Sequence, residues 1–135
     1  MRSRSTIGCA ECHDAGVRVS VLIVDDHDSF RRLARRLLER AGYAVVAEAA
    51  DGASALRAVD DLQPDVVLLD VLLPDTSGFA LADQIAARGS PRRPVVLLTS
   101  SRSASDYGAA LHGRRFLAKN ELNPARIRAA LGGAA

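Results

Sequence analysis

Residues 64–79, with the sequence PDVVLLDVLLPDTSGF, contain the strand and the loop that decide the fold. The apolar run at residues 66–69 is typical of a strand that is buried on both faces of a parallel sheet. The run ends on Asp70, and a loop containing Pro74 and Gly78 follows. A carboxylate at the carboxyl end of a buried parallel strand lies where open α/β folds place their ligand sites. Considered alone, Asp70 would be interpreted as a polar residue that ends a strand.

Three other apolar runs in the sequence also end on polar residues. Because the carboxyl ends of parallel strands meet at one edge of a sheet, these polar residues are expected to gather there. The runs are residues 19–24 (VSVLIV), followed by Asp25 and Asp26; residues 95–98 (VVLL), followed by Thr99 and Ser100; and residues 116–118 (FLA), followed by Lys119. With Asp70, they would bring together three carboxylates, two hydroxyls and one ammonium group.

From about residue 17 onward, predicted strands and helices alternate, which is typical of βαβ units. Helical spacing of apolar residues, caps and stop signals place the helices at about residues 28–41, 51–63, 79–88, 103–111 and 124–131. Five strands and five helices predict an α/β fold, a flavodoxin-like, doubly wound, five-stranded parallel sheet with strand order 2-1-3-4-5. Its switch point would bring Asp25, Asp26 and Asp70 together.

Length, composition and charge narrow the class of protein. The 135 residues are expected to form one domain at residues 17–131, flanked by a flexible extension at residues 1–16 and a tail at residues 132–135. No apolar run approaches the roughly 18 residues that a membrane helix needs, and no secretory signal is present, so a cytoplasmic location without membrane contact is expected. The formal net charge is only +2, and the arginines form no concentrated face for direct nucleic-acid binding.

The N-terminal extension contains Cys9-Ala10-Glu11-Cys12-His13, which matches the CxxCH pattern of haem attachment. That attachment requires export, which nothing in the sequence indicates, and a zinc site would need a fourth ligand. Haem and a structural metal are minor alternatives, and a visible absorption band on purification would reveal a haem. The natural start could also be Val17 or a nearby residue, directly before the first strand.

The acidic cluster predicts a metal site. Like charges 4 Å apart repel by about 4 kcal/mol at an effective dielectric of 20, so neighbouring carboxylates favour a hard cation. An incomplete cage of oxygen ligands suits Mg²⁺ together with a phosphate group. Asp70 could then act as a nucleophile and form an aspartyl phosphate. Lys119, the only lysine in the sequence, and Thr99 would meet the phosphoryl oxygens opposite the metal.

In this order and at these strand ends, Asp25-Asp26, Asp70, Thr99 and Lys119 resemble the receiver domain of two-component response regulators. The segments VLIVDDHDSFRRL, PDVVLLDVLLPDTSG and FLAK are especially similar to receivers of the family that usually carries a LuxR-type DNA-binding domain. The resemblance covers about residues 17–131. It implies that Asp70 is the phosphoacceptor, which takes its phosphoryl group from a sensor histidine kinase, a phosphotransfer protein or a small donor.

The same resemblance implies further roles. Asp26, Asp70 and the backbone carbonyl of Leu72 would bind Mg²⁺ directly, and Asp25 would act through water. Thr99 would move toward the phosphoryl group, and Phe116 would take the coupled aromatic switch position. The sequence departs from the family pattern at Asn120, where receivers often have proline after the lysine. The segment between Thr99 and Lys119 is also short, so the predicted fourth helix is trimmed, and docking or homodimerisation through that face is left open.

The resulting hypothesis is a single-domain receiver without an output domain: a switch for an unnamed downstream protein, and not an enzyme apart from self-dephosphorylation. The main alternative is a phosphorylation-independent interaction module with the same fold. A phosphatase that uses Asp70 is disfavoured because Leu72 stands where such enzymes usually place a second acid. Near the site, Asp28 is interpreted as a helix cap, Asp75 as a turn residue and His27 as a surface residue.

Overall fold

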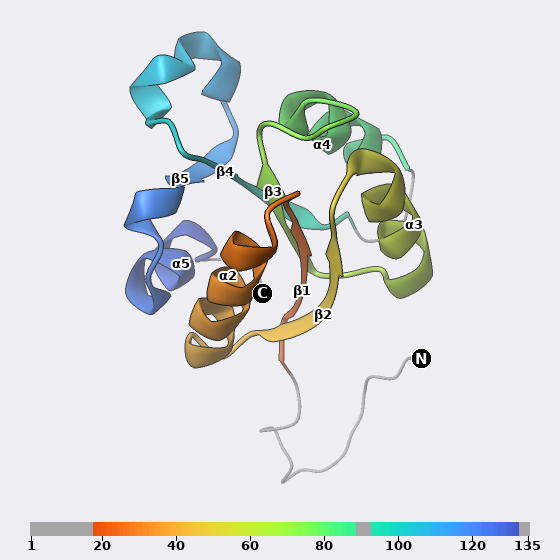
Figure 1. The fold of residues 1–135 in the computed structure, drawn as a ribbon, viewed down its shortest axis with the longest axis vertical. Coiled ribbons are helices and arrows are strands. Elements are labelled where there is room, and N and C mark those ends of the chain that lie inside the picture. The colour runs from red at the N-terminus through yellow and green to blue at the C-terminus, as the bar shows by residue number, and fades with distance from the viewer. Residues whose placement is uncertain (1–17, 89–92, 133–135) are drawn as a thin grey trace, which may run out of the picture.

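The computed structural model describes residues 18–88 and 93–132. Strands and helices alternate along this part of the chain (Figure 1). The strands form one parallel sheet in the order β2-β1-β3-β4-β5, as the sequence predicted. The elements are β1 (Ser20–Val24), α2 (Asp28–Arg40), β2 (Ala44–Ala49), α3 (Gly52–Leu62), β3 (Val66–Asp70), α4 (Gly78–Ala86), β4 (Val95–Ser100), β5 (Arg115–Ala118) and α5 (Pro124–Ala130).

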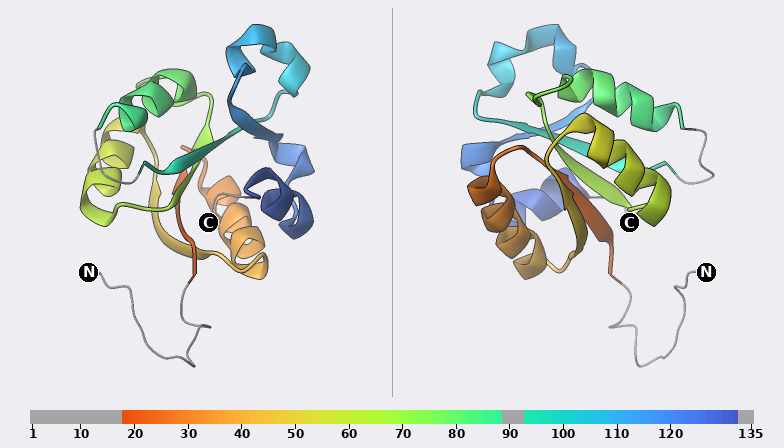
Figure 2. Two further views of the ribbon diagram at one scale, coloured as in Figure 1. Left: turned by 180° about the vertical axis from the view of Figure 1, so that it is seen from behind. Right: turned by 45° about the vertical axis from the view of Figure 1, so that its right-hand side comes forward.

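The sheet separates two hydrophobic clusters because successive strand residues point to opposite faces. On one face, Leu22, Val67 and Leu98 pack with residues of α3 and α4. On the other face, their neighbours Ile23 and Leu68 pack with residues of α2 and α5. Figures 1 and 2 show the two helix pairs on opposite sides of the sheet. All five residues of β3 are buried, as expected for the central strand of a doubly wound fold.

The prediction of five helices was wrong: in the described residues there are four α-helices. The segment between β4 and β5 instead forms two 3₁₀ turns, η1 (Ala104–Asp106) and η2 (Gly108–Leu111), which stand beyond the ends of these strands in Figure 2. Gly108 opposes a regular helix through this segment, because its φ is +55°. The Asp106 carboxylate accepts a hydrogen bond from the backbone N–H of Ser103 at 3.0 Å, as part of the capping box that starts η1.

Three helix starts have the side-chain caps that such starts favour, and α2 does not. Asp51 caps α3 by accepting from the Ser54 N–H at 2.8 Å, and Ser77 and Asn123 play the same role for α4 and α5. The interpretation of Asp28 as a cap was wrong. The helix α2 begins at Asp28 itself, after His27, and the Asp28 carboxylate pairs with Arg31 in the first turn.

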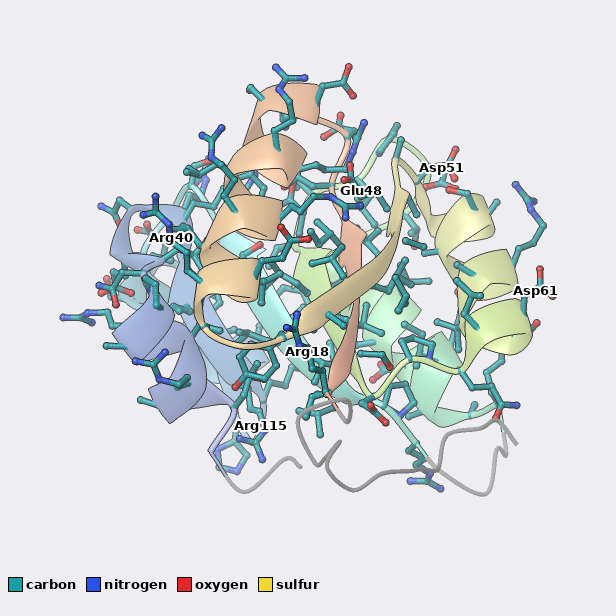
Figure 3. All side chains as sticks on the ribbon, turned by 90° about the horizontal axis from the view of Figure 1, so that it is seen from below. Arg18, Arg40, Glu48, Asp51, Asp61 and Arg115 are labelled. Carbon is teal, nitrogen blue, oxygen red and sulfur yellow. The ribbon has the colours of Figure 1, made fainter. Side chains whose placement is uncertain are left out.

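Two of the five arginines of α2 form ion pairs with β2. The guanidinium groups of Arg31 and Arg35 lie 3.0 and 2.9 Å from the carboxylate of Glu48 on β2. Figure 3 shows Glu48 beside α2, with other labelled charged side chains such as Asp61 and Arg115 at the periphery.

Several sequence-based expectations fall outside the described residues. They concern the extension at residues 1–16 with its CxxCH motif, and all but the first residue of the tail at residues 132–135. The proposed domain boundaries therefore stay predictions. In the residues that the structure does describe, the search for a helix of membrane-spanning length and hydropathy finds none.

Candidate functional site

The carboxyl edge of the sheet brings the predicted site residues together. Asp70 ends β3, and in the parallel ladder its partner on β4 is Thr99. Asp25 follows the last residue of β1, and its N–H donates to the carbonyl of Ala49 at the end of β2. Lys119 follows the last residue of β5. Each of these side chains therefore owes its position to the end of a strand.

Lys119 lies between two of the carboxylates. Its Nζ is 2.6 Å from Oδ2 of Asp25 and 3.4 Å from Oδ2 of Asp70. The ammonium group also lies 4.3 Å from the centroid of the Phe30 ring, within the range of a cation–π contact. Asp25 is fully buried and Asp70 is 4% exposed, so this cation opposes the repulsion between two acids that water does not screen well.

Burial and charge repulsion both act on Asp70. Removal of the carboxyl from water, together with the nearby charge of Asp25, raises the pKa of Asp70 to about 6. The ammonium of Lys119 and the N–H of Leu72, which lies 3.3 Å from Oδ1, act in the opposite direction. The carboxylate of Asp70 therefore lacks compensating positive charge. A ligand that brings positive charge to it recovers the free energy that this lack costs the folded protein.

The acids can hold a metal ion. Asp25, Asp26, His27 and Asp70 each offer a ligand atom, and these atoms all lie within 4.8 Å of one another. Three of the four donors are carboxylates, which are the ligands that a hard cation such as Mg²⁺ prefers. The raised pKa of Asp70 points to the same deficit of positive charge. The residues present thus fit an Mg²⁺ ion.

His27 has a larger part in the site than the sequence suggested. Its side chain is 66% exposed, as expected for a surface residue, but Nδ1 lies 3.1 Å from both Asp25 Oδ1 and Asp26 Oδ1. Its backbone N–H also donates to Asp25 Oδ1 at 2.9 Å. The available signal in the sequence was a histidine next to two aspartates. The position of its ring beside both carboxylates, however, depends on the backbone at the start of α2.

The acids border an open hollow of about 200 Å³. Ser100 and Ser101 form part of its wall, and Leu72, which is 65% exposed, stands at its rim. Thr99 is fully buried, and its Oγ1 has no hydrogen-bond partner in the part of the chain that the structure describes. The hollow is lined by Asp26, His27, Asp70, Leu72, Leu73, Pro74, Ser100, Ser101 and Lys119.

Phe116 lies further from the acids, on β5. It is half-buried, and its ring centroid is 5.9 Å from that of Tyr107. After Lys119 the chain forms a short 3₁₀ turn, η3 (Lys119–Glu121), in which the Glu121 carboxylate accepts from the N–H of Ala118. Asn120 is accommodated in this turn.

Asp75, which was interpreted as a residue of the loop turn, also contacts a second element. Its carboxylate accepts hydrogen bonds from the N–H groups of Gly52 and Ala53, at 2.8 and 3.1 Å. These are free donors at the start of α3, so Asp75 ties the loop after β3 to that helix. The contact spans more than 20 residues of sequence, and no local pattern could have revealed it.

A five-stranded α/β sheet with this acidic edge defines a class of signalling domain, and comparison with known proteins agrees. The family model of the response regulator receiver domain matches residues 21–131. The chain therefore belongs to the response regulator receiver domain family.

Individual proteins show the same relationship. The nitrate/nitrite response regulator protein NarP of Escherichia coli is 41% identical over 92 residues, which cover 67% of this chain and 42% of NarP. A two-component response regulator of the LuxR family from Aurantimonas is 32% identical, with a TM-score of 0.72 and coverage of 85% of this chain and 83% of that one. A CheY-like receiver domain from Methylobacillus flagellatus is 27% identical, with a TM-score of 0.77 and coverage of 88% and 100%.

The similarity is thus to receivers of the LuxR and NarL type. The chain spans less than half the length of the curated relatives that it matches. The site of this receiver domain is an acidic pocket formed by Asp25, Asp26 and Asp70, with Lys119 beside them.

Proposed function

We propose that Asp70 accepts a phosphoryl group in an Mg²⁺-dependent reaction, and that the modified domain switches a protein-binding face. The observation that carries this proposal is the position of Asp70. Its carboxylate is almost fully buried at the end of the central strand, yet it lines the open hollow and lies 3.4 Å from the Lys119 ammonium. A nucleophile needs this combination of access for a donor and a nearby positive charge.

The transfer itself requires little of the protein beyond position and charge. An oxygen of the Asp70 carboxylate attacks the phosphorus atom of a phosphohistidine, the new O–P bond forms, and the P–N bond to the imidazole breaks. The imidazole leaves with the electron pair and takes up a proton. Lys119 opposes negative charge on the transferring group, and the hollow leaves room for the donor side chain.

Asp26 and Asp70, with the Leu72 backbone carbonyl, would hold Mg²⁺ directly, and Asp25 would hold it through water. When bound, this ion supplies positive charge to the phosphoryl oxygens. Asp25 also keeps Lys119 in place through their 2.6 Å contact. The pKa of Asp70, raised to about 6 by burial and by the charge of Asp25, supports Asp70 as the acceptor. A proton, a cation and a phosphoryl group can each relieve the charge of this carboxylate, so the three compete for it.

The response to the modification would begin at the end of β4. We propose that Thr99 turns its hydroxyl to the phosphoryl oxygens, which would give Oγ1 the partner that it lacks among the described residues. Phe116, on the neighbouring strand, would follow as the aromatic switch residue. Leu72 and Ser101, which border the hollow, would control the access of water and hence any self-dephosphorylation.

The phosphoryl donor would be a sensor histidine kinase or a phosphotransfer protein, as is typical of receiver domains. The output would be contact with a downstream protein or with a second copy of the chain rather than direct binding of nucleic acid. The engagement of Arg31 and Arg35 with Glu48 supports this last point, because these cations are not free to contact phosphates.

The test is intact mass after incubation with Mg²⁺ and acetyl phosphate. A single phosphate adduct is expected, which disappears with EDTA and in Asp70→Asn but persists in Asp61→Asn, the same substitution on the exposed surface of α3. Reduction with borohydride should convert the modified residue to homoserine and locate it at position 70. An adduct that persists in Asp70→Asn would overturn the assignment. Failure of acetyl phosphate, a phosphorylated histidine donor and beryllofluoride alike would favour the phosphorylation-independent module.

A further inference from the structure

Tyr107 connects the site to the segment between β4 and β5. It lies between η1 and η2, and its hydroxyl is hydrogen-bonded to the hydroxyl of Ser100. Ser100 is the last residue of β4, is 2% exposed and lines the hollow beside Asp70. Its Oγ also accepts from the N–H of Arg102 at 3.0 Å, so the hydroxyl is held from two sides. One end of the Ser100–Tyr107 pair is therefore in the site, and the other is in η1–η2.

The ring of Tyr107 is held between two other aromatic rings. Its centroid lies 5.8 Å from that of Phe79 on α4 and 5.9 Å from that of Phe116 on β5, and both pairs have edge-to-face geometry. The guanidinium of Arg114 lies over the Phe79 ring, 5.4 Å from its centroid. A ring in such a row cannot change position without moving a neighbour or moving its own backbone.

Tyr107 is also one of two attachments of its segment. Within residues 104–112, Tyr107 and Leu111 are half-buried against the core, and the other residues are exposed. A segment with so few buried contacts is the kind of element whose position a small change can shift. Phe116 cannot form the equivalent polar link because it has no hydroxyl, so in this molecule the hydroxyl is on the neighbouring ring.

We propose that Tyr107 is a positioning residue that couples occupancy of the site to the position of η1–η2 through its hydrogen bond with Ser100. The inference rests on the proposed function, because it concerns the response to a group bound at Asp70. When the group bound at Asp70 draws the end of β4 toward itself, Ser100 either keeps its hydrogen bond and pulls the Tyr107 hydroxyl along, or loses this hydrogen bond. In both cases the aromatic row and η1–η2 change their arrangement, and the exposed surface of residues 104–112 becomes the surface that a partner can distinguish.

The experiment uses ¹⁹F NMR of the full chain with 3-fluorotyrosine. The sequence has two tyrosines, so the spectrum should contain two protein signals, and Tyr43→Phe assigns them. Tyr43 packs in the cluster on the opposite face of the sheet, so its signal is an internal control for folding. Mg²⁺ and beryllofluoride are then added as the phosphoryl mimic. Bound beryllofluoride has its own ¹⁹F signals, which report occupancy in the same spectrum.

The expected result is a shift of the Tyr107 signal on occupancy with little change at Tyr43, and loss of most of that shift in Ser100→Ala. Tyr107→Phe, which keeps the ring, should change the affinity for beryllofluoride by about 5-fold or more, the lower end of usual coupling between sites. Bound beryllofluoride with an unmoved Tyr107 signal would overturn the coupling and leave the proposed function intact. If the Tyr107 signal shifts fully in Ser100→Ala, the shift comes from packing, and the role of the hydrogen bond is overturned. Absence of bound beryllofluoride would overturn this inference, which requires an occupied site. Together with failure of acetyl phosphate and of the phosphohistidine donor, it would overturn the proposed function as well.

Discussion

The carboxylate of Asp70 should destabilise the domain at neutral pH, and Asp70→Asn should reveal by how much. In the folded protein the pKa of Asp70 is raised to about 6 by burial first and by the charge of Asp25 second, from an ordinary value of 3.8. One pKa unit corresponds to about 1.4 kcal/mol, so a shift of about 2 units amounts to roughly 3 kcal/mol.

The sign follows from the direction of the shift. A group with a raised pKa binds its proton more tightly in the folded state, so its contribution to stability is full below the ordinary pKa of 3.8 and is lost as the pH rises through 6. Asparagine does not titrate, so the variant lacks this loss. Its free energy of unfolding relative to wild type should increase with pH, by about 2 kcal/mol between pH 4.5 and pH 7.5.

The measurement is urea denaturation at both pH values in EDTA. Asp61→Asn, on the exposed surface of α3, measures the effect of removing one negative charge from the molecule. The attraction of Lys119 to the ionised carboxylate is already included in the pKa of Asp70. Changes in packing around the amide do not titrate, so they cancel in the comparison between pH values. A difference between wild type and Asp70→Asn that stays constant from pH 4.5 to pH 7.5 would refute the reasoning. Added Mg²⁺ should then stabilise the wild type more than the variant, because binding to the folded state adds its own free energy.

Three further substitutions test other parts of the site and its supports. Lys119→Met should lower the free energy of unfolding at pH 7.5, measured by urea denaturation, by about 3 kcal/mol, because it leaves two buried carboxylates without their cation. It should also raise the pKa of Asp70 further, as measured by carboxyl NMR titration. Unchanged values would mean that Lys119 contributes no net charge compensation. Gly78→Ala should lower the free energy of unfolding by about 1–3 kcal/mol, because the added Cβ would lie 2.8 Å from the Cα of Val71, where only backbone movement can relieve the contact. Gly132→Ala is the control, because the nearest atom to its added Cβ lies at 3.3 Å. Equal losses of stability in the two variants would contradict the argument. Asp75→Ala should lower the free energy of unfolding by about 1–2 kcal/mol, because it leaves two N–H groups of α3 without their acceptor. The phosphate adduct should still be seen by mass spectrometry. Loss of the adduct would place Asp75 in the reaction itself.

Sequence patterns were sufficient for the sheet and for the gathering of the acids. Buried parallel strands need continuous apolar runs, and in this chain each such run bears its polar residue at the carboxyl end. Once the strand order was inferred, the meeting of Asp25 with Asp70 followed from topology rather than from any distance along the chain. Lys119 was found in the same way, at the end of the last strand.

The features that sequence patterns missed depend on contacts between segments. Residues 103–111 have a composition compatible with a helix, but Gly108 turns the backbone to a positive φ and Tyr107 turns inward to meet Ser100. The choice between one helix and two 3₁₀ turns therefore combines the backbone turn at Gly108 with the packing of Tyr107 against α4 and β5. The role of Asp75 was missed for a similar reason, because its N–H partners belong to another helix.

The charges of the site explain why a lysine, and not an arginine, lies between the carboxylates of Asp25 and Asp70. The Nζ of Lys119 reaches both Asp25 and Asp70, at 2.6 and 3.4 Å, and still borders a hollow of about 200 Å³. A planar guanidinium would occupy more of that hollow and would bind one carboxylate with both arms, whereas an ammonium can turn from one oxygen to another. Its single charge leaves the three acids under-compensated, which the raised pKa of Asp70 reflects. A domain with a typical stability of about 5–15 kcal/mol can tolerate roughly 3 kcal/mol of such strain. The same free energy then favours any group that brings positive charge to the site, so the destabilising effect of the acids and their affinity for a cation have one electrostatic origin.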